Sequence, residues 1–478
     1  MSWITKNSAT NETPGKGTEE AILRMEELNV HFFTRRGEIK AIRGLNFSVR
    51  KGEILGIVGE SGSGKSVTAL SIIDLLPVGV GAITSGAIFF EENKISDLYR
   101  SKYRFRVRKG GVKIRRTRPA RGTENEIQKI RGRISMIFQD PLTSLDPLYS
   151  IKAQLLESIV YNDKDTMIRR ILEKNDIKSK NSKLLESVND LPLKEFIQSV
   201  LESYGQQGFY QELLLIGNSG FKESDKKVRI LNSINKTEVL SVNLIGSLKK
   251  KLGAKSKRPW KPKNKKRYSR LNKVDSLIFE EAILYSLELL EFVDMPHPEK
   301  VLDSFPHELS GGMKQRIMIA LAIANKPEIL IADEPTTALD VITQYEILYL
   351  LKTLNSKLGL TVLFITHDLG VLAALADRIL VMYAGKVNEI GPTESVLGDP
   401  LHPYTKGLLK SVPIKSGNDS DLYTIPGQVP DLLNPPTGCA FANRCEFAKD
   451  ICRTDEPPKV LINNREIHCW LYEDEHHD

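Results

Sequence analysis

The segment GESGSGKS (59–66) constrains the fold of this chain more than any other, because of what lies on either side of it. EILGIVG (53–59) is a short apolar run that ends in glycine, typical of a buried strand, and SVTALSIIDLL (66–76) has helical spacing. A glycine-rich loop between a strand and a helix presents successive backbone N–H groups to an anion, which predicts phosphate binding. In the pattern G-x-x-x-x-G-K-S/T, Lys65 reaches the β- and γ-phosphates and Ser66 ligates Mg²⁺. The predicted triphosphate-binding residues are Gly59, Glu60, Ser61, Gly62, Ser63, Gly64, Lys65 and Ser66.

The segment ILIADEP (329–335) supplies the acidic groups that such a site needs. Its apolar residues predict a buried strand, and two adjacent carboxylates follow. We expect Asp333, at the strand end, to lie in the Mg²⁺ shell. We expect Glu334, one residue further, to point towards the γ-phosphate and to polarise the attacking water.

Strand and helix patterns alternate over much of the chain, which indicates an α/β domain with a largely parallel sheet. KPEILIADEP (326–335) and TVLFITHD (361–368) have the pattern of buried strands, with a helical pattern between them, and ILRMEELNVHFF (22–33) predicts an earlier strand. From about residue 396 the composition becomes proline-rich and loop-rich. We therefore expect a main domain that ends near residue 395 and a separate, small appendage over 396–478.

The formal net charge of +8 is concentrated in two blocks. Residues 100–121 carry eleven Lys or Arg and no acid, and residues 249–273 carry thirteen and no acid, so the rest of the chain is net acidic. Such blocks are typical of solvated segments, and the alternative is contact with anionic lipid or RNA. The polar residues 1–21 predict a flexible tail without a signal peptide, and no apolar run approaches the ~18 residues of a membrane span. From these features we expect the chain to lie in the cytoplasm.

LSGGMKQR (309–316) resembles the signature sequence of ATP-binding cassette (ABC) ATPases. The resemblance implies an ABC-type P-loop nucleotide-binding domain over 22–395, with a RecA-like core, an antiparallel β subdomain and a helical subdomain that carries the signature. In this family the signature of one subunit faces the phosphate loop of a second, so that ATP lies between two chains. A helix that begins at the signature favours an anion there, because its free N–H groups and the helix dipole attract negative charge. The implied ATP contacts of the signature are Ser310, Gly311, Gly312 and Gln315.

Further segments match the same family in the expected order. Gln139 in MIFQDP resembles the Q-loop residue, which joins the Mg²⁺ site to the membrane partner. Asp340 in TTALD resembles the D-loop residue, and His367 in FITHD resembles the switch histidine at the γ-phosphate. The implied catalytic residues are therefore Glu334, His367 and Gln139, with Mg²⁺ held by Ser66, Gln139 and Asp333. Adenine typically stacks on an early aromatic residue, for which Phe32 is the candidate and Phe33 the next.

Longer stretches, among them FPHELSGGMKQRIMIA (305–320) and HPYTKGLLKSVP (402–413), resemble the ATPase subunits of oligopeptide and dipeptide importers. The segments at about 98–127 and 161–276 depart from that pattern and are interpreted as insertions. The resemblance implies a second, paralogous ATPase subunit in a heterodimer, two permease subunits, and indirectly an extracytoplasmic peptide-binding protein. It places the chain on the cytoplasmic side of the cell membrane, with no specific nucleic acid. The alternatives are another cargo such as nickel chelates, or a soluble ABC ATPase of nucleic acid or ribosomes.

All four cysteines lie near the end of the chain, at Cys439, Cys445, Cys452 and Cys469. Disulfides do not suit a cytoplasmic chain, and the C-x2-C pair typical of zinc sites is missing. Some importer ATPases of this family carry a 4Fe–4S cluster in an appendage of this type. The segment NPPTGCAFANRC (434–445) resembles the sequence motif of that appendage. Three hypotheses stay open: an iron–sulfur cluster, zinc, or free thiols.

Overall fold

The computed structural model describes residues 20–108, 111–117, 121–140, 144–162, 164–173, 248–249, 273–337, 339–411 and 423–475. The chain divides into two compact units. The first, here called the sheet unit, comprises residues 14–140 and 327–478, and the second, the helical unit, contains residues 141–326. Each unit is described by itself.

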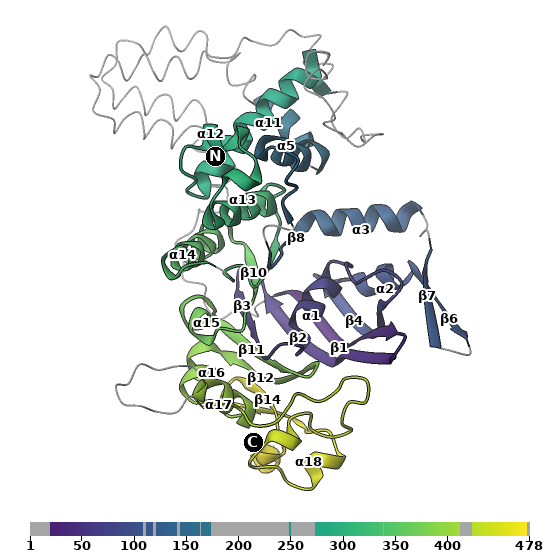
Figure 1. Cartoon of the computed structure of the whole chain (residues 1–478). Helices are drawn as coiled ribbons and strands as arrows, with labels where there is room; N and C mark the ends of the chain where they lie inside the picture. The colour runs from purple at the N-terminus through teal and green to yellow at the C-terminus, as the bar shows by residue number, and fades with distance from the viewer. Residues whose placement is uncertain are drawn as a thin grey trace. The chain divides into compact units, whose positions relative to one another are not determined.

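A mixed eight-stranded sheet forms the centre of the sheet unit (Figure 1). Its strand order is β13-β14-β12-β11-β3-β10-β9-β8, and the five strands from β11 to β8 are parallel. Every residue of β3, β9 and β10 is buried, which explains why these strands are continuous apolar runs in the sequence. The strands are β3 (Ile54–Val58), β8 (Ile134–Ile137), β9 (Ile329–Asp333), β10 (Thr361–Ile365), β11 (Arg378–Tyr383), β12 (Lys386–Pro392), β13 (Lys459–Ile462) and β14 (Arg465–His468).

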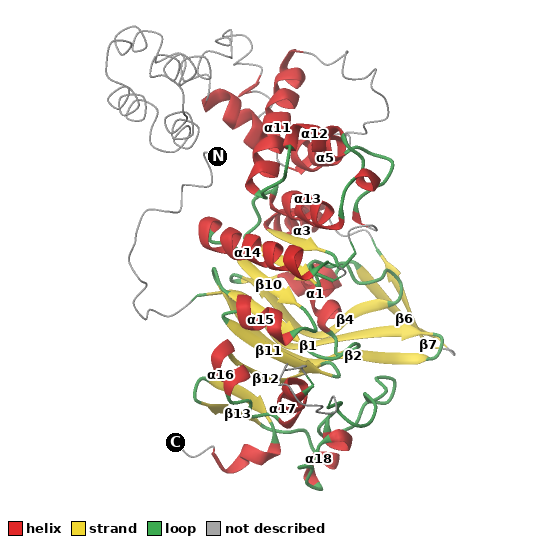
Figure 2. Ribbon diagram, turned by 60° about the vertical axis from the view of Figure 1, so that its left-hand side comes forward, coloured by secondary structure: helices red, strands yellow, loops and turns green. Residues whose placement is uncertain are grey.

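Helices cover both faces of this sheet. On β3, Leu55 and Ile57 pack in one core cluster with Ala69 of α1 (Lys65–Ile72), whereas Gly56 lies against Leu372 of α15 (Leu369–Leu375). Because neighbouring strand residues point to opposite faces, α1 and α15 lie on opposite sides. The other helices of this region are α14 (Val341–Leu358), α16 (Thr393–Gly398) and α17 (Pro403–Lys410) (Figure 2).

A four-stranded antiparallel sheet of order β2-β1-β4-β5 shares the core on the α1 side. Its strands are β1 (Ala21–Thr34), β2 (Gly37–Arg50), β4 (Gly81–Phe90) and β5 (Asn93–Lys94). Ile42 and Phe90 belong to the same cluster as Leu55 and Leu363 of the parallel sheet. The predicted α/β core with an antiparallel β subdomain is therefore confirmed.

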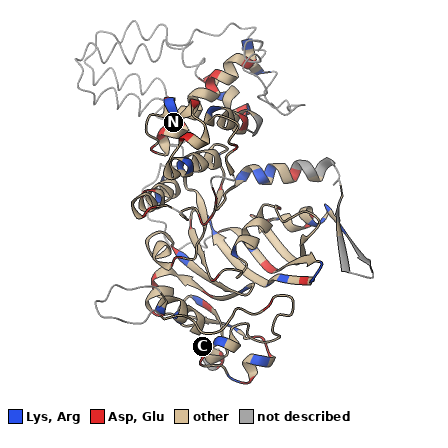
Figure 3. Cartoon of the chain, in the orientation of Figure 1, with Lys and Arg blue, Asp and Glu red and all other residues tan. Residues whose placement is uncertain are grey.

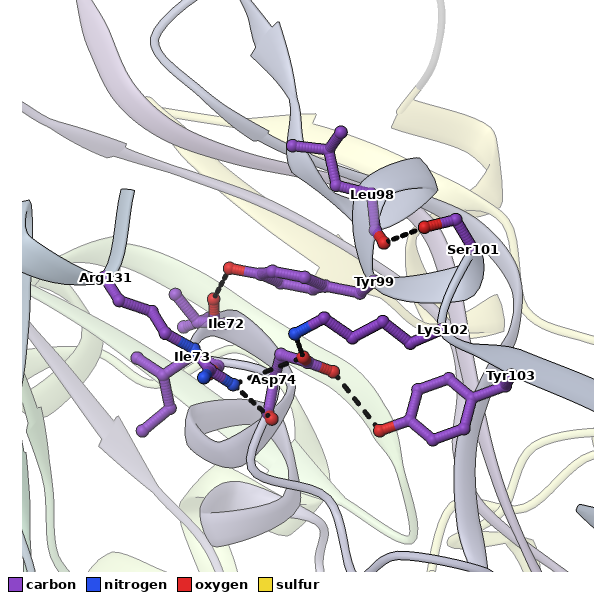
Figure 4. Close-up of polar contacts among 9 residues, drawn as sticks. All are labelled: Ile72, Ile73, Asp74, Leu98, Tyr99, Ser101, Lys102, Tyr103 and Arg131. Carbon is purple, nitrogen blue, oxygen red and sulfur yellow. Dashed lines mark hydrogen bonds and ion pairs between the residues drawn. The ribbon is translucent and has the colours of Figure 1, made fainter. Parts of the chain in front are cut away.

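The first basic block begins at Arg100, the last residue of α2 (Ile95–Arg100), and contains a two-stranded antiparallel hairpin, β6 (Tyr103–Arg108) and β7 (Gly111–Arg116). Its base is anchored by Lys102, whose side chain is fully buried and donates a 2.7 Å hydrogen bond to Asp74 (Figure 4). The chain then enters α3 (Arg121–Arg133), where Lys and Arg recur (blue in Figure 3). The predicted insertion at about 98–127 thus begins inside α2 and ends inside α3.

The helical unit packs α5 (Ile151–Asn162) against α11 (Lys273–Phe292). The short α12 (Pro298–Asp303) and the 3₁₀ turn η2 (Pro306–Glu308) lead into α13 (Gly311–Ile323). Most of the predicted insertion at about 161–276 lies outside the described residues. Within the described ranges, no helix is both long and apolar enough to cross a membrane.

The C-terminal segment is less separate than its composition suggested. It contains the 3₁₀ turn η3 (Ala442–Arg444), α18 (Ile451–Thr454) and η4 (Trp470–Glu475), yet β14 pairs with β12 and so extends the central sheet. Phe441 packs against Tyr383 and Tyr404, with ring centroids 5.3 and 5.2 Å away. The described C-terminal residues therefore share a compact unit with the central sheet, while the predicted boundary near residue 395 stays a prediction.

Candidate active site

Two of the three glycines in the loop at 59–66, Gly59 and Gly64, have neighbouring atoms close to where a Cβ would lie. A Cβ on Gly59 would lie 2.1 Å from the carbonyl oxygen of Met382, and one on Gly64 would lie 2.7 Å from Ile42 Cδ1. Gly64 also has a φ of 103°, in the left-handed region, where it caps α1. A larger residue at position 59 would require the backbone near Met382 to move, and one at position 64 would be strained by the left-handed φ and crowded by Ile42.

Lys65, the first residue of α1, is buried and turned towards its own loop. Its Nζ donates to the carbonyl oxygen of Gly59 at 2.6 Å and to that of Glu60 at 3.1 Å. Burial lowers the pKa of Lys65, and the negative charges of Glu334, Asp333 and Glu60 counteract part of that shift. The ammonium group is therefore surrounded by oxygen atoms, which suits a residue that exchanges carbonyl for phosphate partners.

Ser66 and Asp333 meet as the sequence predicts. The Ser66 Oγ donates to Asp333 Oδ1 at 3.2 Å, and Asp333 ends β9 with a nearly buried side chain. Burial raises the pKa of Asp333, and the nearby charge of Glu334 adds to the rise, while the Ser66 hydrogen bond and Lys65 oppose it. A hydroxyl and a carboxylate at this separation are oxygen ligands of the type that Mg²⁺ prefers alongside nucleotide phosphates.

Glu334 is the centre of a hydrogen-bonded group at the ends of the parallel strands. Its carboxylate accepts from Gln139 Nε2 at 2.9 Å and from Thr337 Oγ1 at 3.1 Å, and lies 3.2 Å from His367 Nδ1. Its backbone has a φ of 47°, which is strained for glutamate. The structure thus brings Gln139, Glu334 and His367 together, with the Gln139 amide donating to Glu334. The predicted part of Gln139 in holding Mg²⁺ stays a prediction.

Thr337 was missed by the sequence analysis. It follows Glu334 by three residues in a tight turn, closed by a 3.2 Å hydrogen bond from the Thr337 N–H to the Glu334 carbonyl oxygen. The only signal in the sequence was its place between Glu334 and the D-loop residue Asp340. Asp340 itself caps α14, and its pKa is lowered because the backbone N–H and hydroxyl of Thr343 donate to its carboxylate.

The signature residues begin a helix, as predicted. Ser310 is the N-cap of α13 and accepts a hydrogen bond from the Met313 N–H, and Gly311 and Gly312 form the first turn. Gln315, in contrast, is 1% exposed. Its predicted contact with ATP stays a prediction.

Phe32 packs against the core cluster and against Gly81, and it is only half-buried. Phe33 follows on the other face of β1, where its ring lies 6.4 Å from that of His31. The stacking of adenine on Phe32, or on Phe33, also stays a prediction.

The four cysteines lie within electrostatic range of one another and form no disulfide. Burial raises the pKa of Cys439 and of Cys469 to about 11, with a further rise from the neighbouring cysteines. The Cys439 N–H donates to the Cys452 carbonyl oxygen at 2.8 Å. Sulfur donors suit iron or zinc, but across the part of the chain that the structure describes no group of His, Cys, Asp or Glu is arranged to hold a metal ion.

Comparison with known proteins places these features in a family. The "ABC transporter" family model matches residues 42–208 and 239–337, and the model for the "Oligopeptide/dipeptide transporter, C-terminal region" matches residues 388–452. The chain is 34% identical over 453 residues to the oligopeptide transport ATP-binding protein OppD of Bacillus subtilis (strain 168), covering 94% of this chain and 88% of that protein. It is 34% identical over 446 residues to the dipeptide transport ATP-binding protein DppD of Lactococcus lactis subsp. cremoris, covering 93% and 89%.

A third relative, the oligopeptide transport ATP-binding protein OppD of Haemophilus influenzae, is 31% identical over 452 residues, covering 94% of this chain and 97% of that protein. The chain therefore belongs to the ABC transporter family, among the ATP-binding proteins related to those of oligopeptide and dipeptide transport.

Proposed function

We propose that this chain hydrolyses ATP and that the hydrolysis powers the import of oligopeptides or dipeptides through a membrane permease. The observation that carries the proposal is the convergence of Lys65, Ser66, Asp333 and Glu334 at the end of one parallel sheet. The names of the relatives, all peptide transport ATP-binding proteins, support the peptide cargo.

Each residue has a role that its position supports. The N–H groups of residues 59–66 and Lys65 bind the triphosphate, and Ser66 with Asp333 would hold Mg²⁺, which supplies charge neutralisation at the phosphates. Glu334 orients and polarises the attacking water, and His367 contacts the γ-phosphate. The Gln139 amide donates a hydrogen bond to Glu334 and so connects this carboxylate to the segment that follows β8.

The proposed assembly contains a second ATPase subunit and two permease subunits at the cytoplasmic face of the membrane. Ser310, Gly311 and Gly312 would bind the ATP held by the partner ATPase, because a helix N-terminus favours an anion. The partner ATPase is proposed to be a paralogue of this chain, and an extracytoplasmic peptide-binding protein is proposed to deliver the cargo. Peptides are the proposed cargo, and nickel chelates are the alternative. Co-purification from membranes with two multi-span proteins is the expected result. Turnover that is stimulated by RNA in their absence would favour a soluble nucleic-acid ATPase instead.

The substitution Glu334→Gln tests the catalytic assignment. The amide keeps the shape of the carboxylate but not its basicity, so ATP binding is retained and hydrolysis falls by about 10²–10⁴-fold. Glu394→Gln, at an exposed glutamate in α16, is the matched control and should leave the rate unchanged. Wild-type turnover by Glu334→Gln would show that another group acts on the water.

The cysteines have a separate test. An iron–sulfur cluster stays a prediction from family resemblance, and anaerobic purification with iron, sulfide and zinc assays decides it. Protein without these elements would leave four thiols that stabilise the segment by burial.

A further inference from the structure

Glu60, the second residue of the phosphate-binding loop, is held at three places, two of them by residues far along the chain. Its backbone N–H donates to the Tyr404 hydroxyl at 2.9 Å. Its carbonyl oxygen accepts from Lys65 Nζ. Its carboxylate accepts a bidentate pair of hydrogen bonds, at 2.7 and 3.0 Å, from the two terminal nitrogens of Arg444, which lies 384 residues further along the chain.

Arg444 is itself rigidly placed. Its side chain is 6% exposed, and every guanidinium nitrogen has an acceptor. Nε donates to the Pro426 carbonyl oxygen, one terminal nitrogen donates to the Ile425 carbonyl oxygen, and the other donates to the Tyr383 hydroxyl. Such a fork matches a carboxylate in a way that a lysine cannot.

The segment that carries Arg444 is the one with the cysteines. Arg444 ends the 3₁₀ turn η3, directly before Cys445, and Phe441, the N-cap of the same turn, packs against Tyr383 and Tyr404. The cysteine-bearing part of the C-terminal segment therefore reaches the phosphate-binding loop through the Arg444–Glu60 ion pair, and no residue of the predicted catalytic set takes part in that contact.

We infer that Arg444 is a positioning residue for ATP binding, which neutralises the carboxylate of Glu60 and fixes the loop at residues 59–60. The inference rests on the proposed ATP site at this loop. Without Arg444, the Glu60 carboxylate repels the triphosphate and competes with it for the Lys65 ammonium group. The loss falls on ATP affinity, whereas the groups around Glu334 that act on water stay in place.

The substitution Arg444→Gln gives the first measurement, on the full chain with Mg²⁺ and ATP. Loss of a charge-assisted pair predicts binding that is weaker by about tenfold or more, seen as a higher KM with a kcat close to that of the wild type. Arg453→Gln is the matched control, since Arg453 lies in the same segment and binds the Asn443 side chain. This control should retain wild-type affinity.

The second measurement combines Arg444→Gln with Glu60→Gln. If Arg444 acts through the charge of Glu60, removing that charge restores ATP affinity to within about threefold of the Glu60→Gln single variant. A double variant as weak as Arg444→Gln alone would overturn the inference, since Arg444 would then act by its own charge or by folding the segment. Unchanged affinity in Arg444→Gln would overturn it as well. A wild-type chain that fails to bind ATP would instead reject the proposed function, so the two failures are distinguishable.

Discussion

Replacing Asp74 by Asn tests how the basic hairpin is attached to the sheet unit. The Asp74 side chain is 4% exposed and accepts from Lys102 at 2.7 Å, from Arg131 at 3.2 Å and from the Tyr103 hydroxyl at 3.4 Å (Figure 4). Its backbone has a φ of 54°, in the left-handed region, which Asn tolerates. The substitution therefore removes the charge and little else.

The size of the effect follows from the burial of the cation. The Lys102 side chain is 0% exposed, so without the carboxylate its ammonium group stays buried without a counter-charge. Arg131 loses less, since it is 33% exposed and keeps the carbonyl oxygens of Ile73 and Asp74. Breaking a buried ion pair by removing one partner costs about 3–5 kcal/mol, and we expect Asp74→Asn to lower the free energy of unfolding by that amount.

The assay is urea denaturation followed by far-ultraviolet circular dichroism. Asp97→Asn is the control, because this carboxylate is 55% exposed and its pairs with Lys94 and Arg100 contribute only about 0–1 kcal/mol. Adding Lys102→Met to Asp74→Asn should restore most of the stability, since the uncompensated charge is gone. A loss below about 1 kcal/mol for Asp74→Asn would refute the reasoning, because it would mean that Lys102 reaches water.

Two further predictions concern the sheet unit. Burial, with smaller contributions from the charges of His468 and Lys406, lowers the pKa of His402 to about 3, so below pH 6.5 the unfolded chain binds a proton that the folded chain does not. Stability should then fall as the pH drops from about 6.5 towards 3, by up to about 1.4 kcal/mol per pH unit. The variant His402→Asn keeps a capping acceptor for the Tyr404 N–H. In urea denaturation at pH 6, 5 and 4, its free energy of unfolding should fall less than that of the wild type. Equal falls in the two proteins would contradict the assignment of this pH dependence to His402. Gly59→Ala should weaken ATP binding by about tenfold or more, because its Cβ would lie 2.1 Å from the Met382 carbonyl oxygen. Gly398→Ala, where a Cβ meets nothing within 4 Å, should bind ATP normally, and equal affinities would refute the packing argument.

Three strands of the central sheet, β3, β9 and β10, could be predicted because every residue in them is buried and the apolar run is continuous in the sequence. A short apolar run such as the one ending at Asp333 is assigned to a strand rather than a helix by its length of five residues. The ends of elements were less predictable. The sequence has a helical pattern over 66–76, but the helix α1 ends at Ile72, and the chain turns at Asp74, whose carboxylate contacts Lys102. No local pattern signals that turn, because its reason lies 28 residues further on.

In the candidate site, too, some residues could be predicted from the sequence and others could not. Lys65, Asp333 and Glu334 could be predicted because each lies where a strand or loop leads directly into the site. Thr337 and Arg444 could not, since neither residue type nor spacing reveals which acceptor a side chain will meet. The cysteines were the most conspicuous feature of the C-terminal segment, yet the contact with the phosphate-binding loop comes from the arginine beside one of them.

The contacts within the site also show what ATP has to replace. Lys65 already donates to two carbonyl oxygens, and the Glu334 carboxylate already has Gln139, Thr337 and His367 as partners. In the proposed ATP complex, phosphate and water exchange for these partners, so binding yields only the difference in free energy between two sets of hydrogen bonds. That difference depends on how firmly the loop is held before ATP arrives. A loop fixed at Glu60 by Arg444 and Tyr404 needs less ordering on binding, and the C-terminal segment can therefore influence ATP affinity without touching the nucleotide.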